Sequence, residues 1–314
     1  MVALLGVDIG GTNVKTALVS VDGAVLSFAS GSWSGRGPAD AVETAALSVP
    51  GLVDEAGVSP AVCGCACAGL VDSARGVVHS SPNLPTWSDV RLADMLSERL
   101  GLNVKLENDA NAAAFAEFEV GAAREAGNAV MLTLGTGVGG GIVLGGALYR
   151  GSHGSAGEIG HTTIDLDGAA CVCGSRGCLE GMASAGAVVR HAVEMIGGGR
   201  ESALSPAVSA GTLSSRDVGA AAARGDEVAL ESLAAVGRNL GVGLANISQI
   251  LDPDVIVVGG GVAEAGDLLL APAREEMRAR LSACDFRAPL IVAAELGETA
   301  GVVGAALLAR DGRL

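Results

Sequence analysis

The segment 161–178 carries four side chains of the kind that bind soft metal ions. They are His161, Cys171, Cys173 and Cys178. One imidazole and three thiolates form the ligand set of a closed structural zinc site, which leaves no coordination position for a reactive water. Glycines between the cysteines allow the tight turns that would bring the sulfur atoms together. The sequence therefore predicts a structural zinc ion on these four residues, and the alternative is a set of reduced, inert thiols.

Three other cysteines, Cys63, Cys65 and Cys67, alternate along a predicted strand. Alternate residues of a strand lie about 7 Å apart on one face, whereas each sulfur ligand lies about 2.3 Å from a shared zinc ion. We therefore interpret these cysteines as small buried hydrophobic side chains. The odd total of 7 cysteines and the lack of an export signal also argue against a disulfide framework.

Two glycine-rich turns could hold the phosphates of a nucleotide. The first contains Asp8, Gly10, Gly11, Thr12 and Asn13, and the second contains Gly135, Thr136 and Gly137. Glycine lets the backbone approach a ligand and present N–H donors to it. Each turn alone could be an ordinary hairpin, but two such turns from two related lobes could grip a polyphosphate from both sides. Neither is a Walker loop, because no Gly-Lys-Ser/Thr sequence follows.

Asp109 lies where a predicted strand, 104–107, meets a predicted helix, 110–120. An aspartate at this position can cap the helix by accepting N–H groups of its first turn. It can also accept the proton of an attacking hydroxyl group during phosphoryl transfer, a reaction in which the base mainly positions the nucleophile. Both interpretations can hold together, and the second makes Asp109 the candidate catalytic base.

The hydrophobic pattern predicts an α/β protein in which strands alternate with helices. Strands are expected at 4–8, 14–19, 24–28, 61–66, 104–107, 129–134, 140–144, 147–149 and 255–258. Helices are expected at 39–49, 92–100, 110–120, 184–195, 227–250 and 300–308, and 197–213 is expected to be a mobile surface loop. The strand, glycine turn and strand of 4–28 return at 129–149, which suggests two related lobes. We place an N-terminal lobe at 1–118, joined by the C-terminal helix 299–314, and a C-terminal lobe with the zinc loop at 119–298.

The charge balance limits the partners of the chain. Its 35 acidic and 20 basic residues give a net charge of -15, which leaves no basic face for a nucleic-acid backbone. ATP remains compatible, because backbone N–H groups and Mg²⁺ can carry the phosphate charge. No apolar run approaches the length of about 18 residues that a membrane span needs. We therefore expect a soluble, cytoplasmic protein that binds neither nucleic acid nor membrane.

Motifs spread along nearly the whole chain resemble the ROK family of bacterial sugar kinases and repressors, in the actin and hexokinase superfamily. They lie at 8–12, 82–85, 107–111, 134–137, 157–161, 171–180 and 252–261. Each motif is weak alone, but their occurrence in this order is highly specific. The resemblance implies an α/β, two-lobed actin/hexokinase-like (RNase H-like) fold with an interlobe cleft.

The resemblance also implies an ATP-dependent hexose kinase that uses MgATP, with O6 of glucose or a glucose-like sugar as acceptor and Asp109 as catalytic base. The residues implied for the sugar are Gly69, Asn83, Asn108, Asp109, Glu158, His161 and Glu180. The residues implied for the nucleotide are Asp8, Gly10, Gly11, Thr12, Asn13, Lys15, Gly135, Thr136, Gly137, Gly259 and Gly260. His161 would serve both the sugar and the zinc ion. We further expect lobe closure on sugar binding and a homodimer or higher homo-oligomer.

Two departures from the family pattern leave the preferred sugar open. Family kinases usually carry a proline before the glycine that matches Gly69, and often one after it, where this chain has Ala68 and Leu70. Thr86 replaces the glycine of the Asn-Leu-Pro-Gly-Trp pattern of glucokinases. Gly69 is expected near the 3-position of the sugar, so the alternative substrates are the amino sugars kanosamine, N-acetylglucosamine and N-acetylmannosamine.

Two other classes of protein share this fold. A ROK-type transcriptional regulator would carry a helix-turn-helix segment before the first strand, which here begins by residue 4. An actin-like ATPase would have no use for the hydroxyl-binding residues Glu158, His161 and Glu180.

Overall fold

The computed structural model describes residues 2–33, 37–81, 84, 86–282 and 286–310. The chain divides into two compact units. Unit 1 consists of Met1–Ala126, Gly141–Gly157 and Glu295–Leu314, and unit 2 consists of Gly127–Gly140 and Glu158–Ala294. Residues 119–126, 141–157 and 295–298, which the sequence analysis places in the C-terminal lobe, group with unit 1.

The main sheet of unit 1 has the strand order β3-β2-β1-β4-β8. Its strands are β1 (Ala3–Ile9), β2 (Asn13–Ser20), β3 (Val25–Ser32), β4 (Pro60–Cys67) and β8 (Val104–Asn108). β1 is antiparallel to β2 and parallel to β4, and β4 is parallel to β8. The carboxyl ends of β1, β4 and β8 therefore meet at one edge of the sheet, where ligands bind in open α/β sheets. Asp8 and Asn108 both lie at this edge.

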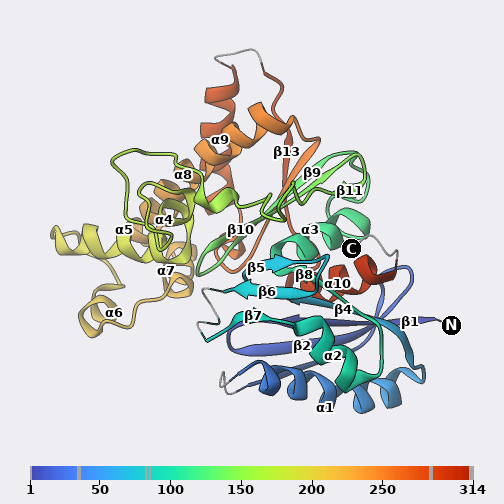
Figure 1. Cartoon of the computed structure of the whole chain (residues 1–314). Coiled ribbons are helices and arrows are strands. Elements are labelled where there is room, and N and C mark those ends of the chain that lie inside the picture. The colour runs from blue at the N-terminus through green and yellow to red at the C-terminus, as the bar shows by residue number, and fades with distance from the viewer. Residues whose placement is uncertain (1, 34–36, 82–83, 85, 283–285, 311–314) are drawn as a thin grey trace. The chain divides into compact units, whose positions relative to one another are not determined.

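Helices cover both faces of this sheet (Figure 1). α1 (Pro38–Ala56) and α2 (Leu92–Leu100) pack on one face, and α3 (Asp109–Glu119) and α10 (Ala300–Arg310) pack on the other. Successive side chains of a strand point to opposite faces. In β1, Leu5, Val7 and Ile9 accordingly enter the core under α1 and α2, while Leu4 enters the core with Phe115 of α3. Burial on both faces explains why β1 is an almost continuous apolar run.

A smaller sheet of order β5-β6-β7 follows β4 in unit 1. It consists of β5 (Leu70–Asp72), β6 (Val77–Ser80) and β7 (Ser88–Val90). The sequence analysis did not predict these three short strands, because strands of three or four residues give too few alternating positions for a periodic signal.

The second main sheet has the order β11-β10-β9-β12-β13. Its strands are β9 (Ala129–Leu134), β10 (Val138–Leu144), β11 (Ala147–Leu148), β12 (Val255–Gly259) and β13 (Leu290–Ala293). β10 is antiparallel to β11, while β12 is parallel to β9 and β13. Residues of β10 from Gly141 onward, and β11, are counted with unit 1. The strand order repeats that of the first main sheet.

The long helix α8 (Glu227–Leu251) is the centre of the helical part of unit 2 and packs against α4, α5, α7 and α9. These are α4 (Leu179–Ala183), α5 (Ala185–Gly197), α7 (Ser215–Ala223) and α9 (Asp267–Ser282). Single 3-10 turns lie at η1 (Ile159–His161), η2 (Ala263–Ala265) and, in unit 1, η3 (Gly297–Thr299). Asp226 caps α8 by accepting the N–H of Ala229, which fixes the start of the helix that the apolar pattern predicted.

The prediction of a loop throughout 197–213 is wrong in part, because α6 (Ser205–Ala210) lies within it. α7 was also not predicted, although Ser214 and Asp217 form a capping box at its start. α9 and β13 are further elements that the sequence analysis left unassigned. Among the described residues, no helix has both the length and the apolar character needed to cross a membrane.

Candidate active site and metal site

Asp109 is the first residue of α3 and directly follows β8, so the sheet edge fixes its position. Its Oδ1 accepts the N–H of Ala110 at 2.9 Å. The residue that caps the helix is Asn108, whose Oδ1 accepts the N–H of Asn111 at 3.1 Å. The N-cap position thus belongs to Asn108, and Asp109 follows it, although its carboxylate accepts an N–H of the first turn, as the capping interpretation expected.

Asp8, at the end of β1, is a second carboxyl group close to Asp109. Burial and, to a smaller extent, the negative charge of Asp109 raise the pKa of Asp8 to about 7, while Lys15 opposes the shift. Two carboxyl groups in one site resist being ionised together. The edge of the sheet in unit 1 thus combines a carboxylate with a carboxyl group that holds its proton near neutral pH.

The first glycine turn connects β1 and β2. Gly10 donates its N–H to the carbonyl of Asn13 at 3.0 Å, and Gly11 and Thr12 are exposed. Trp33 holds the turn from outside: its Nε1 donates to the Gly10 carbonyl at 3.0 Å, and its backbone N–H donates to the Thr12 carbonyl at 3.1 Å. The turn is therefore fixed in shape and still open to a ligand.

Lys15, predicted to contact the nucleotide, is tied to η3. Its Nζ donates to the backbone carbonyl of Glu298 at 3.0 Å and lies 3.8 Å from that residue's carboxylate.

Trp33, which holds the glycine turn, packs against Trp87 with ring centroids 5.9 Å apart. A single aromatic pair thus connects the turn to the segment that follows the predicted sugar residue Asn83, which lies outside the described residues.

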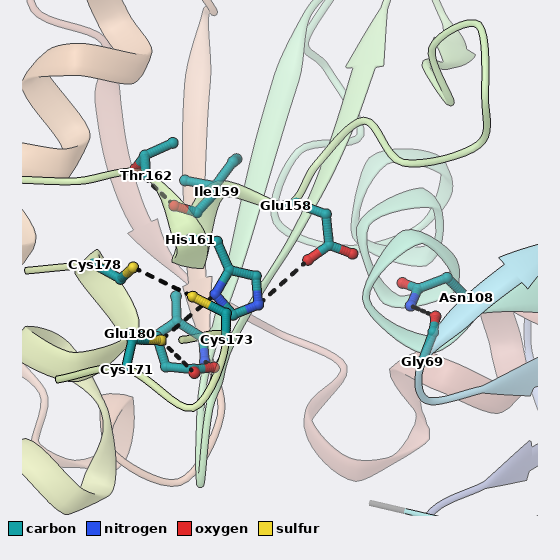
Figure 2. Close-up of polar contacts among 11 residues, drawn as sticks. Gly69, Asn108, Glu158, Ile159, His161, Thr162, Cys171, Cys173, Cys178 and Glu180 are labelled. Atoms are coloured by element: carbon teal, nitrogen blue, oxygen red, sulfur yellow. Dashed lines mark hydrogen bonds and ion pairs between the residues drawn. The ribbon is translucent and has the colours of Figure 1, made fainter. Parts of the chain in front are cut away.

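Two other predicted sugar residues of unit 1 are in direct contact. The Asn108 Nδ2 donates to the carbonyl of Gly69 at 3.1 Å (Figure 2). Gly69 lies between β4 and β5 with φ +117°, a conformation that favours glycine. The amide of Asn108 therefore serves both the cap of α3 and the loop expected near the 3-position of the sugar.

The three cysteines of β4 are buried, with no exposed surface, in agreement with their interpretation as small hydrophobic side chains. Burial raises the pKa of Cys63 to about 12 and also raises the pKa of Cys65 and Cys67. They remain neutral thiols that fill the core of unit 1.

The four predicted metal ligands come together in unit 2. One donor atom from each of His161, Cys171, Cys173 and Cys178 lies within 4.8 Å of all the others. The sulfur atoms of Cys173 and Cys178 are 3.7 Å apart, and Nδ1 of His161 is 3.7 Å from the sulfur of Cys171 (Figure 2). Sulfur ligands at about 2.3 Å from a tetrahedral zinc ion are about 3.8 Å apart, whereas a disulfide requires about 2.05 Å. The donor set therefore fits zinc.

The backbone of the cysteine loop is shaped by a close approach at Gly177. This residue has φ +63°, and a Cβ atom there would lie 1.4 Å from the carbonyl oxygen of Asp165. Cys171 donates its N–H to the carbonyl of Ser175 at 2.9 Å. This hydrogen bond closes a turn that contains Cys171 and Cys173. Glycine at 177 is thus required to close the loop on its ligands, as the spacing suggested.

His161 faces the sulfur cluster with one ring nitrogen and Glu158 with the other. While Nδ1 points to Cys171, Nε2 lies 3.8 Å from the Glu158 carboxylate (Figure 2). Both residues belong to the short segment that contains η1. The geometry lets the ring occupy the metal site with Nδ1 and present Nε2 to a neighbouring oxygen.

Glu180 connects the cysteine loop to the second glycine turn. Its Oε1 lies 3.4 Å from the sulfur of Cys171, and its Oε2 accepts the N–H of Val138 at 3.1 Å. A Cβ atom on Gly137 would lie 2.4 Å from Oε2, so a larger residue there would have to displace this carboxylate. The carbonyl of Gly135 in turn accepts the N–H of Ala185 at 2.9 Å.

A cavity of about 260 Å³ lies in unit 2, between α7, α8 and the segment that follows β12. Its lining includes Ser215, Arg216, Gly219, Gly261, Val262 and Glu264. Of the predicted nucleotide residues at the end of β12, Gly259 is buried and Gly260 turns the chain with φ +87°. The residue after them, Gly261, lines the cavity. The residues of α7 that line the cavity were missed by the sequence analysis, because nothing in their local pattern relates them to 261–264.

A sequence comparison decides the family. The sequence model of the ROK family matches residues 4–312 of the chain. The chain belongs to the ROK family. It is 38% identical over 312 residues to the protein named glucokinase of Streptomyces coelicolor. The matched region covers 98% of this chain and 97% of that protein.

Solved ROK structures share the fold. A ROK family glucokinase from Streptomyces griseus, in complex with glucose and AMPPNP, is similar with a TM-score of 0.86 at 37% identity, over 99% of this chain and 100% of that chain. A ROK family transcriptional regulator, a homologue of the E. coli MLC protein, also gives a TM-score of 0.86, at 28% identity and over 78% of that chain. These similarities confirm the predicted α/β, actin/hexokinase-like fold and the predicted family.

Proposed function

We propose that this ROK protein is an ATP-dependent glucose kinase, which transfers the γ-phosphoryl group of ATP to a hydroxyl group of glucose, with O6 as the acceptor. The observation that carries this proposal is Asp109. It stands at the ligand-binding edge of the sheet beside Asp8, in a chain 38% identical over nearly its full length to a glucokinase. That similarity favours glucose over an amino sugar, and a kinase over a regulator or an actin-like ATPase.

In the proposed reaction, Asp109 orients the attacking hydroxyl group and accepts its proton. The sugar oxygen forms a bond to the γ-phosphorus while the bond from that phosphorus to the bridging oxygen breaks, and ADP leaves with the electron pair. Mg²⁺ would neutralise charge on the phosphate oxygens, as in other phosphoryl transfers. Because the transition state is loose, the main contribution of Asp109 is position.

The sugar is proposed to contact a first set of residues, Gly69, Asn83 and Asn108, and a second set, Glu158, His161 and Glu180. Amides and carboxylates suit this role, because they can donate to and accept from neighbouring hydroxyl groups. The contact of Asn108 with Gly69 supports the first set, and that of His161 with Glu158 supports the second. Each pair would present a preformed polar edge to a ring of hydroxyl groups.

The two glycine turns are proposed to hold the phosphates of ATP, and the cavity beside α7 to hold its adenosine part. Exposed backbone at Gly11, Thr12 and Thr136 supports the first assignment. The cavity supports the second, since its apolar lining with a few polar groups is typical of nucleotide pockets.

Zinc is proposed on His161, Cys171, Cys173 and Cys178 as a structural ion. The 3.7 Å distance between the sulfur atoms of Cys173 and Cys178 supports it, and four protein ligands leave no position for metal-bound water. The ion would fix the loop and, through His161 and Glu180, the residues proposed for the sugar.

A sugar panel coupled to ADP release tests this function. With ATP and Mg²⁺, glucose should give the highest kcat/KM, and the product should carry phosphate at O6 by ³¹P NMR. A higher kcat/KM for kanosamine, N-acetylglucosamine or N-acetylmannosamine would transfer the assignment to that sugar. ADP release at the same rate without any sugar would instead indicate an ATPase. The use of ATP fits the predicted cytoplasmic location, and the expected homo-oligomer stays a prediction.

A further inference from the structure

An ion pair with a buried carboxylate adjoins the turn that carries Asp109. Glu107 is the residue before Asn108 in β8, and only 2% of its side chain is exposed. Its Oε2 accepts the Nε–H of Arg150 at 2.7 Å, and 24% of the Arg150 side chain is exposed. Both residues belong to unit 1, although they lie 43 positions apart in the chain.

The second oxygen of Glu107 holds the turn itself. Oε1 accepts the backbone N–H of Asn108 at 2.9 Å and the Nδ2–H of Asn111 at 3.0 Å. These two residues flank Asp109 at positions -1 and +2. The carboxylate of Glu107 thus contacts the chain on both sides of Asp109, while its own orientation is set by Arg150.

Arg150 is itself held by the backbone around it. The preceding residue, Tyr149, donates its N–H to Ile142 at 2.8 Å, and the carbonyl of Arg150 accepts the N–H of Ala156 at 3.0 Å. The backbone at Arg150 is thus fixed, and the planar guanidinium that it carries can hold a carboxylate in one orientation, which a flexible Lys side chain does less well. Buried carboxylates require such partners, because an unpaired buried charge is costly.

We propose that Arg150 is a positioning residue for phosphoryl transfer, and that it acts through Glu107 on the Asn108-Asp109 turn. The proposal rests on the proposed function, in which Asp109 is the base. Arg150 orients Glu107, Glu107 holds the N–H of Asn108 and the amide of Asn111, and the Asp109 carboxylate between them is presented to the hydroxyl group. Misplacement of a reacting group by about 1 Å can cost about 100-fold in rate, so a small rotation of this turn would suffice.

The pair could instead serve only the stability of unit 1, and the test must separate the two roles. Arg150→Met alone would leave the Glu107 charge buried without a cation and could unfold the protein. The double variant Glu107→Gln with Arg150→Met removes both charges together, which a buried pair often tolerates. Arg150→Lys keeps the charge but changes its geometry. Arg99→Met is the matched control, because Arg99 makes an exposed two-bond pair with Glu43 on α1, away from the turn.

The measurements are kcat and KM for both substrates, the dissociation constant of AMPPNP and the urea midpoint, on the full-length chain. We expect the double variant to lose about 100-fold in kcat. Its KM values and AMPPNP affinity should stay within about threefold of wild type, and its urea midpoint should equal that of wild type. Arg150→Lys should partly recover kcat. Arg99→Met should match wild type. A wild-type kcat in the double variant, or a loss of kcat that only follows the loss of folded protein, would overturn the positioning role.

Asp109→Asn, measured in the same series, separates this proposal from the function on which it rests. If Asp109→Asn is inactive while the double variant has a wild-type kcat, only the positioning role is overturned. If Asp109→Asn keeps a wild-type kcat, the assignment of the base is overturned, and the positioning role is overturned with it.

Discussion

The carboxyl group of Asp8 lies close enough to Asp109 for the negative charge of Asp109 to raise the Asp8 pKa. Burial makes the larger contribution, and together they bring this pKa to about 7 from a usual value of 3.8. The two residues come from β1 and from the start of α3, and the parallel order of β1, β4 and β8 brings them to the same edge. Asp8 therefore changes its charge near neutral pH in the folded protein.

This shift predicts a pH-dependent stability. Unfolded Asp8 releases its proton above about pH 4, whereas folded Asp8 keeps it until about pH 7, so the folded state binds more protons between these values. Stability should therefore fall as pH rises from 4 to 7 and then level off, by an amount of the order of a few kcal/mol. Asp8→Asn should remove this fall, as measured by urea unfolding without ligands at pH 5 and pH 8. Equal pH dependence in both proteins would contradict the assigned pKa.

Removal of the metal should affect both folding and sugar binding. The purified protein should contain about one zinc ion per chain. Cys178→Ser or a strong chelator should lower the melting temperature. Either treatment should also raise KM for glucose more than KM for ATP, because His161 and Glu180 contact Cys171 of the cluster. Cys63→Ala is the matched control, since Cys63 is buried in unit 1. Full glucose affinity in protein shown to be free of zinc would contradict the proposed coupling.

Glu117 should be important for stability without touching a substrate. Its side chain is fully buried and accepts three backbone N–H groups, from Ala122 at 2.8 Å, Glu295 at 3.2 Å and Leu296 at 2.8 Å. Glu117→Gln turns an NH₂ group toward some of these donors, so the free energy of unfolding should fall by roughly 1–3 kcal/mol.

The control for Glu117 is Glu231→Gln, which removes an exposed ion pair with Arg200 and should change stability by less than about 1 kcal/mol. The stability of both variants is measured by the midpoint of urea unfolding. A loss in Glu117→Gln no larger than that of the control would show that the three N–H contacts do not determine the stability of this segment.

A larger side chain at Gly219 should fill the cavity beside α7 without disturbing the fold. A Cβ atom at Gly219 meets no heavy atom within 4 Å, and Gly219 lines the cavity. Leucine also favours the helix more than glycine does. Gly219→Leu should therefore raise KM for ATP by about tenfold or more, which corresponds to about 1.4 kcal/mol of lost binding, while KM for glucose and the urea midpoint stay near wild type.

Gly51→Leu is the matched control for Gly219→Leu, because Gly51 lies in α1, outside this cavity, and also has open space around its Cβ position. It should leave both KM values unchanged. An unchanged KM for ATP in Gly219→Leu would remove the cavity from the proposed nucleotide site.

The features that could be predicted from sequence are those with a local cause. The zinc ligands lie within one short segment, so their spacing alone indicated that their donor atoms meet. The continuous apolar run of β1 and the long apolar pattern of α8 likewise belong to single elements. The cap of α3 shows the limit of this reasoning, since Asn108 and Asp109 can both cap a helix and only the structure shows that Asn108 does.

The features that could not be predicted arise from contacts between distant segments. Nothing near Glu107 in the sequence indicates that Arg150 would pair with it, and residues of α7 meet 261–264 only through the packing of unit 2. The small sheet β5-β6-β7 was missed for another reason, because its strands are too short for a periodic signal.

The central claim is that Asp109 is the base of a glucose kinase, and one variant tests it most directly. Asp109→Asn keeps the size of the side chain but cannot accept the hydroxyl proton. We expect glucose-dependent ADP release to fall by a factor of roughly 10² to 10⁴, while the dissociation constant of AMPPNP stays at the wild-type value. Glucose phosphorylation by Asp109→Asn at the wild-type rate would contradict the account.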